Sequence, residues 1–299
     1  MDAVVMWGTN ARNAHPIFFH HVIKGIDNGA RSWTIDPRRT STAKFTDSWL
    51  GLNVGTDIGL AHGVAREIIA AGLTDDEFIR NATTGYEEFV AFVEPWTLEH
   101  TAEVTGVPAE AIRDLAHGYA TAPTAQICWT LGITEHHTGV DNVQSLCNLA
   151  LLTGHVGRWG SGLVPLRGQN NVQGGGDMGA LPNKLSGFQD VEDDEVRAKF
   201  EAAWDCEIPP KNGWNLTQMF EAMERDELKA VYIIGENPAD SEADVKHARA
   251  MLEKLDMLVV QDVFMTRTAK MADVVLPAAL GWAESDGTAT NSERRVQRM

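Results

Sequence analysis

A polar, glycine-rich stretch between Leu163 and Leu181, LVPLRGQNNVQGGGDMGAL, holds the residues of this sequence best suited to binding chemistry. It combines the guanidinium of Arg167 with directed amide and carboxylate groups and with glycines, which let backbone approach a ligand closely. The amides and the acid are those of Gln169, Asn170, Asn171, Gln173 and Asp177. A segment this rich in directed donors is typical of a binding loop.

The same stretch shows neither the helical nor the strand period, so we expect a loop throughout. The alternative is a solvated Gly/Asn linker without fixed structure. Val172, Met178 and Leu181 provide apolar anchors that a linker lacks, and they favour the binding loop.

Length and charge limit the possible ligands. The chain has 299 residues, a length typical of about two domains, and a formal net charge of −17. This excess of acid disfavours binding to nucleic acid or to an anionic membrane surface. A phosphate-bearing ligand would therefore need local donors such as helix N-termini, glycine turns and a few arginines. No apolar run approaches the ~18 residues of a membrane span, so we expect no membrane insertion.

The cysteines and histidines do not predict a metal site within the chain. Cys128, Cys147 and Cys206 form no CxxC pair, which argues against a disulfide framework and a self-contained zinc or iron-sulfur site. A reducing, cytoplasmic location is the expectation. His136 and His137 lack a third ligand at coordinating spacing, so we expect them to hold no metal.

The elements that must position a ligand occur twice. In the first half, an apolar strand at Ala3–Trp7 leads into a turn with Gly8 and Asn10 and then into a helix. A second strand ends at Asp36. Ligands of such βαβ units lie where strand ends meet helix N-termini, so Asp36 is placed to bind a ribose or a base edge. Its alternative role is that of a helix cap or a turn former before proline.

The second half repeats this layout without a clear sequence repeat. The strand Ala230–Ile234 leads to Gly235 and Asn237, and a later strand ends at Asp262. A further buried strand in the first half ends at a polar turn beginning with Gly132. Because the GxGxxG fingerprint is absent, a standard NAD site is not expected.

These patterns predict an α/β fold with two doubly wound, Rossmann-like domains and mostly parallel sheets. We expect the first dinucleotide-binding domain at residues 1–168 and the second at 169–280. Residues 281–299 would begin a further segment.

Several longer strings resemble one protein family. The strings are CNLALLTGHVGRWGSG, LVPLRGQNNVQGGGDMGALPNKLSG, AVYIIGENP, LVVQDVFMTRTAKMADVVLPA and ESDGTATNSERRVQR. They resemble the catalytic subunit of molybdenum- or tungsten-dependent formate dehydrogenases, which are molybdopterin oxidoreductases with two pyranopterin guanine dinucleotides. The resemblance implies an active site between two nucleotide-binding domains.

The resemblance also implies roles for single residues. Arg167 resembles the arginine beside the metal that holds formate, and a bidentate guanidinium is the strongest handle for this small carboxylate. The alternative is that Arg167 only pairs with a phosphate or a protein carboxylate. By resemblance, the pterin or its diphosphate is bound by Gln169, Asn171, Gly174 and Asp177. The first guanine dinucleotide is assigned to Gly8, Asn10, Asp36 and Arg38, and the second to Gly235, Glu236, Asn237 and Asp262. Gly132, in the polar turn after the further buried strand, is another cofactor-binding candidate. A closing segment matches at Glu284, Gly287, Thr288, Asn291 and Arg294.

Parts of the family pattern are missing. The sequence has no four-cysteine iron-sulfur domain and no metal-ligating cysteine or selenocysteine followed by histidine. We therefore expect the chain to be a piece of a longer protein. The longer protein would oxidise formate to carbon dioxide and pass two electrons to the metal, to iron-sulfur clusters and to electron-transfer subunits. The piece alone is expected to be inactive and to hold guanine dinucleotide weakly at most.

Two other interpretations fit the same residues. One keeps the cofactor and changes the substrate, as in a nitrate reductase-like bis-molybdopterin oxidoreductase. The other is a non-catalytic scaffold that has the fold without the metal, although a scaffold has no reason to keep so many polar groups in one loop.

Overall fold

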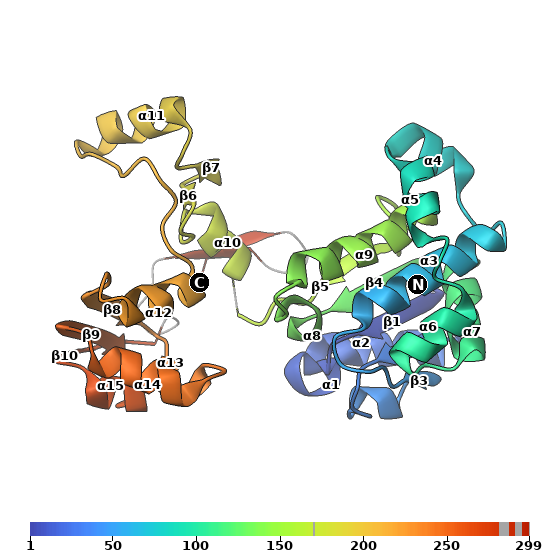
Figure 1. Cartoon of the computed structure of the whole chain (residues 1–299), viewed down its shortest axis with the longest axis horizontal. Helices are drawn as coiled ribbons and strands as arrows, with labels where there is room; N and C mark the ends of the chain where they lie inside the picture. Colours follow the sequence, from blue (N-terminus) through green and yellow to red (C-terminus); the bar gives the residue numbers. More distant parts are fainter. Residues whose placement is uncertain (170, 281–286, 291–294, 299) are drawn as a thin grey trace. The chain divides into compact units, whose positions relative to one another are not determined.

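The computed structural model describes residues 1–169, 171–280, 287–290 and 295–298. The chain divides into two compact units, Met1–Gly168 (unit 1) and Gln169–Met299 (unit 2), and Figure 1 shows the elements of each. Four residues that the sequence associated with the polar loop or the closing segment lie outside the described residues: Asn170, Glu284, Asn291 and Arg294.

Unit 1 is built on a five-stranded, all-parallel sheet with the order β3-β2-β1-β4-β5. Its strands are β1 (Ala3–Trp7), β2 (Arg31–Ile35), β3 (Ser48–Leu50), β4 (Ala125–Trp129) and β5 (Gly162–Pro165). The chain leaves β1 toward β2 on one side, and β4 lies on the other side. The strand order therefore reverses between β1 and β4, which is where ligands of such sheets bind.

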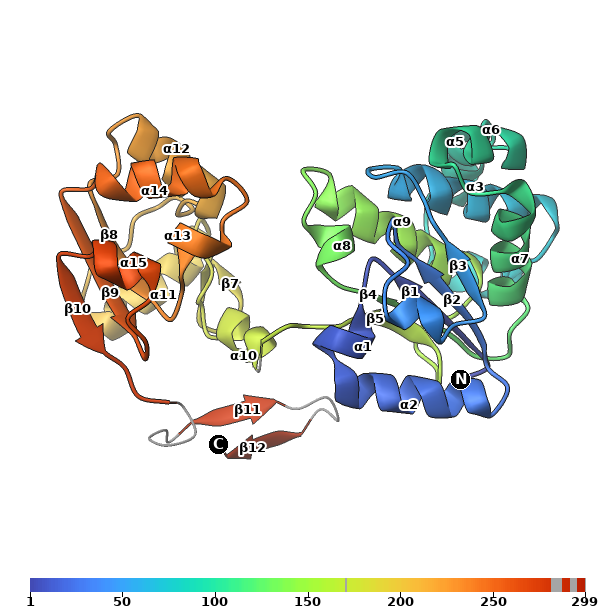
Figure 2. The same cartoon turned by 90° about the horizontal axis from the view of Figure 1, so that it is seen from below.

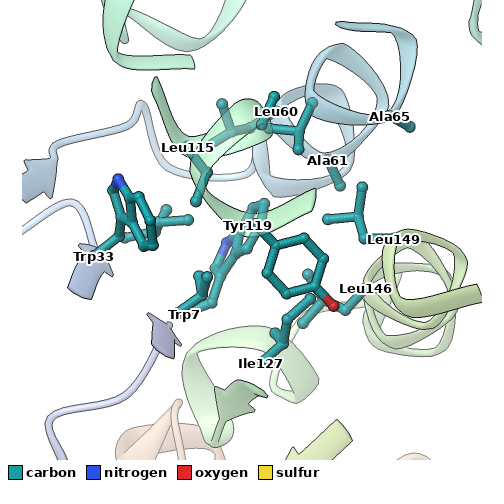
Figure 3. Close-up of a cluster of buried hydrophobic side chains, with 14 of the residues drawn as sticks. Trp7, Trp33, Leu60, Ala61, Ala65, Leu115, Tyr119, Ile127, Leu146 and Leu149 are labelled. Carbon is teal, nitrogen blue, oxygen red and sulfur yellow. The ribbon is translucent and has the colours of Figure 1, made fainter. Parts of the chain in front are cut away.

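Helices cover both faces of this sheet, as Figure 2 shows. Val4 and Met6 of β1 pack with α2 (Pro16–Asp27), whereas Val5 and Trp7 face the opposite core. That core lies under α3 (Asp57–Ala70), α7 (Ala109–Ala120) and α9 (Gly139–Leu152), and Figure 3 shows Trp7, Trp33 and Tyr119 within it. Burial on both faces explains why β1 is a continuous apolar run. The remaining elements of unit 1 are α1 (Ala11–Ala14), η1 (Thr42–Lys44), α4 (Asp76–Ala82), α5 (Tyr86–Val93), α6 (Leu98–Thr105) and α8 (Leu131–Thr134).

Unit 2 contains a three-stranded parallel sheet with the order β10-β9-β8. Its strands are β8 (Ala230–Ile234), β9 (Met257–Asp262) and β10 (Val274–Pro277). Leu258 and Val260 lie in a core with side chains of the neighbouring helices. Those helices are α12 (Leu216–Glu224), α13 (Pro238–Ser241), α14 (Val245–Glu253) and α15 (Arg267–Met271). The other described elements are α10 (Val172–Asp177), α11 (Asp194–Trp204), β6 (Lys184–Leu185), β7 (Gln189–Asp190), β11 (Thr288–Thr290) and β12 (Val296–Arg298).

The predicted α/β class with parallel sheets is confirmed, but the prediction of a loop throughout Leu163–Leu181 is wrong. The stretch begins in strand β5, where Leu163 packs against one core and Val164 against the other. It also contains the short helix α10, preceded by Asn171 in the left-handed conformation at φ 58°. A four-residue edge strand and a six-residue helix are too short to show a period among so many glycines.

None of the described helices is long and apolar enough to cross a membrane.

Candidate functional site

The turns after β1 and after β8 have the same backbone geometry. Gly8 adopts φ +59° and its N–H donates to the carbonyl of Ile35 at 2.8 Å. Gly235 adopts φ +65° and donates to the carbonyl of Gln261 at 2.9 Å. Glycine is favoured at both positions because a Cβ is strained at positive φ. Each turn thereby binds the end of the neighbouring strand, immediately before Asp36 or Asp262.

An asparagine two residues after each glycine contacts the loop after that neighbouring strand. The Asn10 side-chain carbonyl accepts hydrogen bonds from the backbone N–H and the hydroxyl of Thr42, at 3.3 and 3.0 Å. The Asn237 carbonyl accepts the same two bonds from Thr268, at 3.2 and 2.8 Å. Both threonines are 0% exposed, so these bonds are made away from water.

Each threonine hydroxyl has a second partner, again the same in both units. The hydroxyl of Thr42 accepts from the N–H of Arg12 at 3.0 Å, and that of Thr268 from the N–H of Ala239 at 3.1 Å. These N–H groups lie at the start of α1 and α13, where no intrahelical acceptor exists for them. We call the residues around Asn10 and Thr42 half-site 1 and those around Asn237 and Thr268 half-site 2.

The two acids also occupy equivalent positions. Asp36 Oδ1 accepts from the N–H of Arg38 at 2.8 Å, and Asp262 Oδ1 accepts from the N–H of Phe264 at 3.3 Å. Asp36 is 8% exposed, and the Trp49 indole donates to its carbonyl oxygen. Asp36 therefore stabilises a turn through one carboxylate oxygen, and this is the alternative role that the sequence allowed.

A second pair of side chains joins the same two loops, and here the half-sites differ in charge. In half-site 1 the Ser41 hydroxyl lies within hydrogen-bonding distance of Asn13 Oδ1 and, at 2.9 Å, of Asn10 Oδ1, and both contacts are neutral. At the equivalent positions of half-site 2, Arg267 is 2.8 Å from Asp240, which also binds Arg249 at 2.9 Å. Hydrogen bonding from Asn237 and the two arginines lower the pKa of the Asp240 carboxyl. Half-site 2 therefore contains an ionic cluster where half-site 1 has amide and hydroxyl groups.

Half-site 1 lies at the reversal of strand order in the sheet. The N–H of Gly132 and the hydroxyl of Thr130 both donate to the Gly8 carbonyl, at 3.1 and 3.0 Å. A Cβ placed on Gly132 would lie 2.5 Å from that oxygen, and a Cβ on Gly8 would lie 2.8 Å from the Gly132 carbonyl carbon. The turns after β1 and β4 are thus in backbone contact, which requires glycine in both.

Asp57, the first residue of α3, is a buried acid beside Trp7 at the end of β1, and we did not predict it from the sequence. Its Oδ1 accepts from the Trp7 indole at 2.8 Å, and the residue is 9% exposed. Burial raises the pKa of its carboxyl, and Asp36 adds a smaller effect in the same direction. In the sequence, an acid in the first turn of a helix is typical of an ordinary partner of the helix dipole.

The polar stretch crosses the unit boundary, with Arg167 in unit 1 and the residues from Gln169 onward in unit 2. Arg167 follows β5 in unit 1, is exposed, and accepts a 2.7 Å hydrogen bond from His15 Nε2 on its carbonyl oxygen. This contact joins the end of β5 to the start of α2. Because a carbonyl only accepts, Nε2 carries the proton.

The residues of the stretch from Gln169 onward belong to unit 2. The Asn171 side chain donates to the Thr288 carbonyl and accepts from the N–H of Thr290. The Asp177 carbonyl accepts from the N–H of Gly187 at 2.6 Å. Gln169 is exposed, and Gly174 lies within α10.

The structure therefore gathers the predicted residues into three groups. The first contains Gly8, Asn10, Asp36, Arg38 and Gly132; the second contains Gly235, Glu236, Asn237 and Asp262; the third contains Asn171, Gly174 and Asp177 around α10. The sequence missed Thr42 and Thr268, although one signal was available. A Thr-Ala-Lys string begins six residues after Asp36 and again six residues after Asp262.

No cluster of three or more metal-binding side chains occurs among the described residues. His136 instead makes a 2.9 Å hydrogen bond to the Gly132 carbonyl.

Comparisons with known proteins agree on one family. A family model described as molybdopterin oxidoreductase matches residues 1–299. The chain is 46% identical over 299 residues to F420-dependent formate dehydrogenase 2 subunit alpha of Methanococcus maripaludis, covering all of this chain and 44% of that protein. It is 41% identical over 299 residues to formate dehydrogenase H of Escherichia coli, covering all of this chain and 42% of that protein. The chain thus spans less than half the length of these relatives.

A solved structure supports the same fold. Acetylene hydratase from Pelobacter acetylenicus matches 96% of this chain and 42% of its own chain, with a TM-score of 0.73 and 25% sequence identity.

Proposed function

The chain belongs to the molybdopterin oxidoreductase family, and we propose that it forms the cofactor-binding core of a formate dehydrogenase. The observation that carries the proposal is the pair of equivalent half-sites, one per unit, in a chain similar to formate dehydrogenase alpha subunits over its whole length. Two half-sites with the same hydrogen-bond pattern suit a cofactor made of two similar nucleotides.

The residues of the half-sites fit guanine dinucleotides bearing diphosphates. Each half-site offers a glycine turn at a strand end and an asparagine amide. Thr9 adds a buried hydroxyl at the first turn that makes no hydrogen bond among the described residues. In a chain with a net charge of −17, such local donors are required to hold phosphates.

We assign one guanine dinucleotide to each half-site. In half-site 1 it would be held by Gly8, Asn10, Asp36, Arg38 and Gly132, and in half-site 2 by Gly235, Glu236, Asn237 and Asp262. Gln169, Asn171, Gly174 and Asp177 would hold the pterin portion or the diphosphate. When bound, the cofactor's molybdenum or tungsten supplies the two-electron acceptor.

Arg167 is assigned to formate. A planar guanidinium can bind both oxygens of a carboxylate, which fixes the direction of the single C–H bond of formate. The hydrogen bond from His15 to the Arg167 carbonyl holds the backbone of this residue at the end of β5. Lysine would keep the charge but lose the two-point contact.

The test is Arg167→Lys in the native protein, with Arg80→Lys on the exposed surface of α4 as the control. We expect formate oxidation to fall about tenfold to a hundredfold, the cost of one charge-assisted two-point contact, with unchanged metal content. The control should keep full activity. Full activity of Arg167→Lys would overturn the role assigned to this residue.

The whole reaction extends beyond these residues. Iron-sulfur clusters and electron-transfer subunits would carry the electrons onward, and the 299-residue chain alone should not oxidise formate. A nitrate reductase-like substrate and a metal-free scaffold are the competing hypotheses. Metal analysis of the native protein separates the scaffold from the enzyme, and turnover of formate against nitrate separates the two enzymes.

A further inference from the structure

We propose that Thr42 and Thr268 are positioning residues of the two nucleotide half-sites, each fixing which end of its asparagine side chain is presented to the ligand. The inference rests on the proposed function, since it concerns how the same half-sites hold an anionic nucleotide. Neither threonine needs to touch the ligand.

The two ends of an asparagine side chain differ in their hydrogen bonding. The carbonyl end can only accept hydrogen bonds and the amide end can only donate them, so a half-turn of the group exchanges acceptor for donors. A diphosphate accepts hydrogen bonds and repels a carbonyl oxygen. An asparagine at a phosphate site is therefore useful only when its amide end faces the ligand.

The threonines supply that selection. Each gives the asparagine carbonyl two donors, the backbone N–H and the hydroxyl, at 3.3 and 3.0 Å for Asn10 and 3.2 and 2.8 Å for Asn237. If either asparagine were turned over, its NH2 group would face these two donors. In half-site 1 the Ser41 hydroxyl, 2.9 Å from Asn10 Oδ1, is a further donor on the same side. The carbonyl ends are thus held toward the protein.

The released amide ends differ between the half-sites. Among the described residues, the Asn10 amide nitrogen makes no hydrogen bond, whereas that of Asn237 donates to Asp240 Oδ2 at 3.1 Å. Asp240 is in turn bound by Arg249 and Arg267. Half-site 1 therefore offers an uncommitted amide, and half-site 2 offers an amide within an ionic cluster.

The threonine hydroxyls also fix the helix starts. Each hydroxyl donates to the asparagine carbonyl and accepts from the N–H of Arg12 or Ala239 in the first turn of a helix. Removing the hydroxyl therefore takes one hydrogen bond from the asparagine carbonyl and one from that N–H. Valine has nearly the shape of threonine without the hydroxyl, and serine keeps the hydroxyl. These two substitutions separate the hydrogen bonds from side-chain shape.

The chain offers a matched control. The Thr266 hydroxyl accepts from the N–H of Ala269 at 3.1 Å and caps α15, only two residues before Thr268. Thr266→Val therefore removes a hydroxyl from the same loop and weakens the helix without affecting Asn237. A merely structural role of the loop would make Thr266→Val and Thr268→Val behave alike.

The experiment is calorimetric titration of the cofactor-free form of the full-length protein with GDP and, separately, with inorganic pyrophosphate. We expect two sites in the unaltered chain. Thr42→Val should weaken one site about tenfold and Thr268→Val the other, the double variant should weaken both, and the serine variants should bind as the unaltered chain does. Thr266→Val should lower the melting temperature and leave both affinities unchanged.

A second variant covers the case in which a valine substitution prevents folding. Asn10→Asp keeps an acceptor for Thr42 and replaces the amide by a carboxylate, so the chain should fold and half-site 1 should bind pyrophosphate at least about tenfold more weakly. Unchanged pyrophosphate affinity in Asn10→Asp or in the valine variants overturns the positioning role. Pyrophosphate binding with the expected pattern, but without any preference for GDP, supports the positioning role and counts against the guanine dinucleotide. No binding of either probe to the unaltered chain overturns both.

Discussion

The contact between Gly8 and Gly132 gives the sharpest prediction about half-site 1. In Gly132→Ala the new Cβ would lie 2.5 Å from the Gly8 carbonyl oxygen and 2.7 Å from its Cα, all backbone atoms that cannot rotate away. Since a normal carbon–oxygen contact is about 3.4 Å, the two turns must separate by roughly 1 Å. Gly132 does not have positive φ, so alanine adds this steric effect without backbone strain.

Gly132→Ala should lower both the stability of the protein and its affinity for nucleotide. Overpacking of this kind lowers the free energy of unfolding by about 1–3 kcal/mol. A displacement of about 1 Å also moves the donors around Gly8 out of hydrogen-bonding distance, so we expect nucleotide affinity at half-site 1 to fall about tenfold or more.

The assay is denaturant unfolding together with titration by GDP. Gly25→Ala is the matched control, because Gly25 lies within α2 and its new Cβ would meet only the flexible end of Met1. The control should keep normal binding, and alanine should support its helix. If Gly132→Ala unfolds and binds as the unaltered chain does, the two turns do not form a rigid seat for a nucleotide.

Two buried titratable groups give further predictions. Asp57→Asn should raise the free energy of unfolding at neutral pH, because burial raises the carboxyl pKa in the folded state while an amide can still accept from Trp7. The carboxyl of Asp57 binds its proton more tightly in the folded protein than in the unfolded chain, so the stability of the unaltered protein falls as pH rises through the folded pKa. The stability advantage of the Asp57→Asn variant should therefore vanish below about pH 4. Equal stability of the two proteins at neutral pH would contradict a raised pKa for Asp57. His62 packs against Phe92 and Trp96, and burial lowers the pKa of its imidazole. As pH falls, the imidazole is protonated in the unfolded chain before it is protonated in the folded protein, so stability is lost below about pH 6.5. His62→Phe should reduce that loss in unfolding curves measured at several pH values. An unchanged pH profile of stability would contradict this prediction.

Part of the fold could be predicted because apolar strands end in polar glycine turns. Ala3–Trp7 and Ala230–Ile234 were predicted with the bounds that the structure shows. The glycine and asparagine turns were also placed correctly after the strands. Regular strands ending in polar turns leave a clear signal in a single sequence.

The features that were missed depend on tertiary contacts. Strand β5 is defined by pairing with β4, and α10 is too short for its own period to be seen. Thr42 and Thr268 are common polar residues whose complete burial cannot be read from their neighbours. The repeated Thr-Ala-Lys string hinted at them, but only the two sets of matching hydrogen bonds show that the similarity is structural.

The most direct test of the two nucleotide half-sites is to count the guanine nucleotides and metal atoms that the native protein releases on acid denaturation. We expect two guanine nucleotides and one molybdenum or tungsten atom per chain, one nucleotide for each half-site. A protein that carries the metal with no guanine nucleotide, or that carries a nicotinamide nucleotide instead, would contradict the assignment of both half-sites.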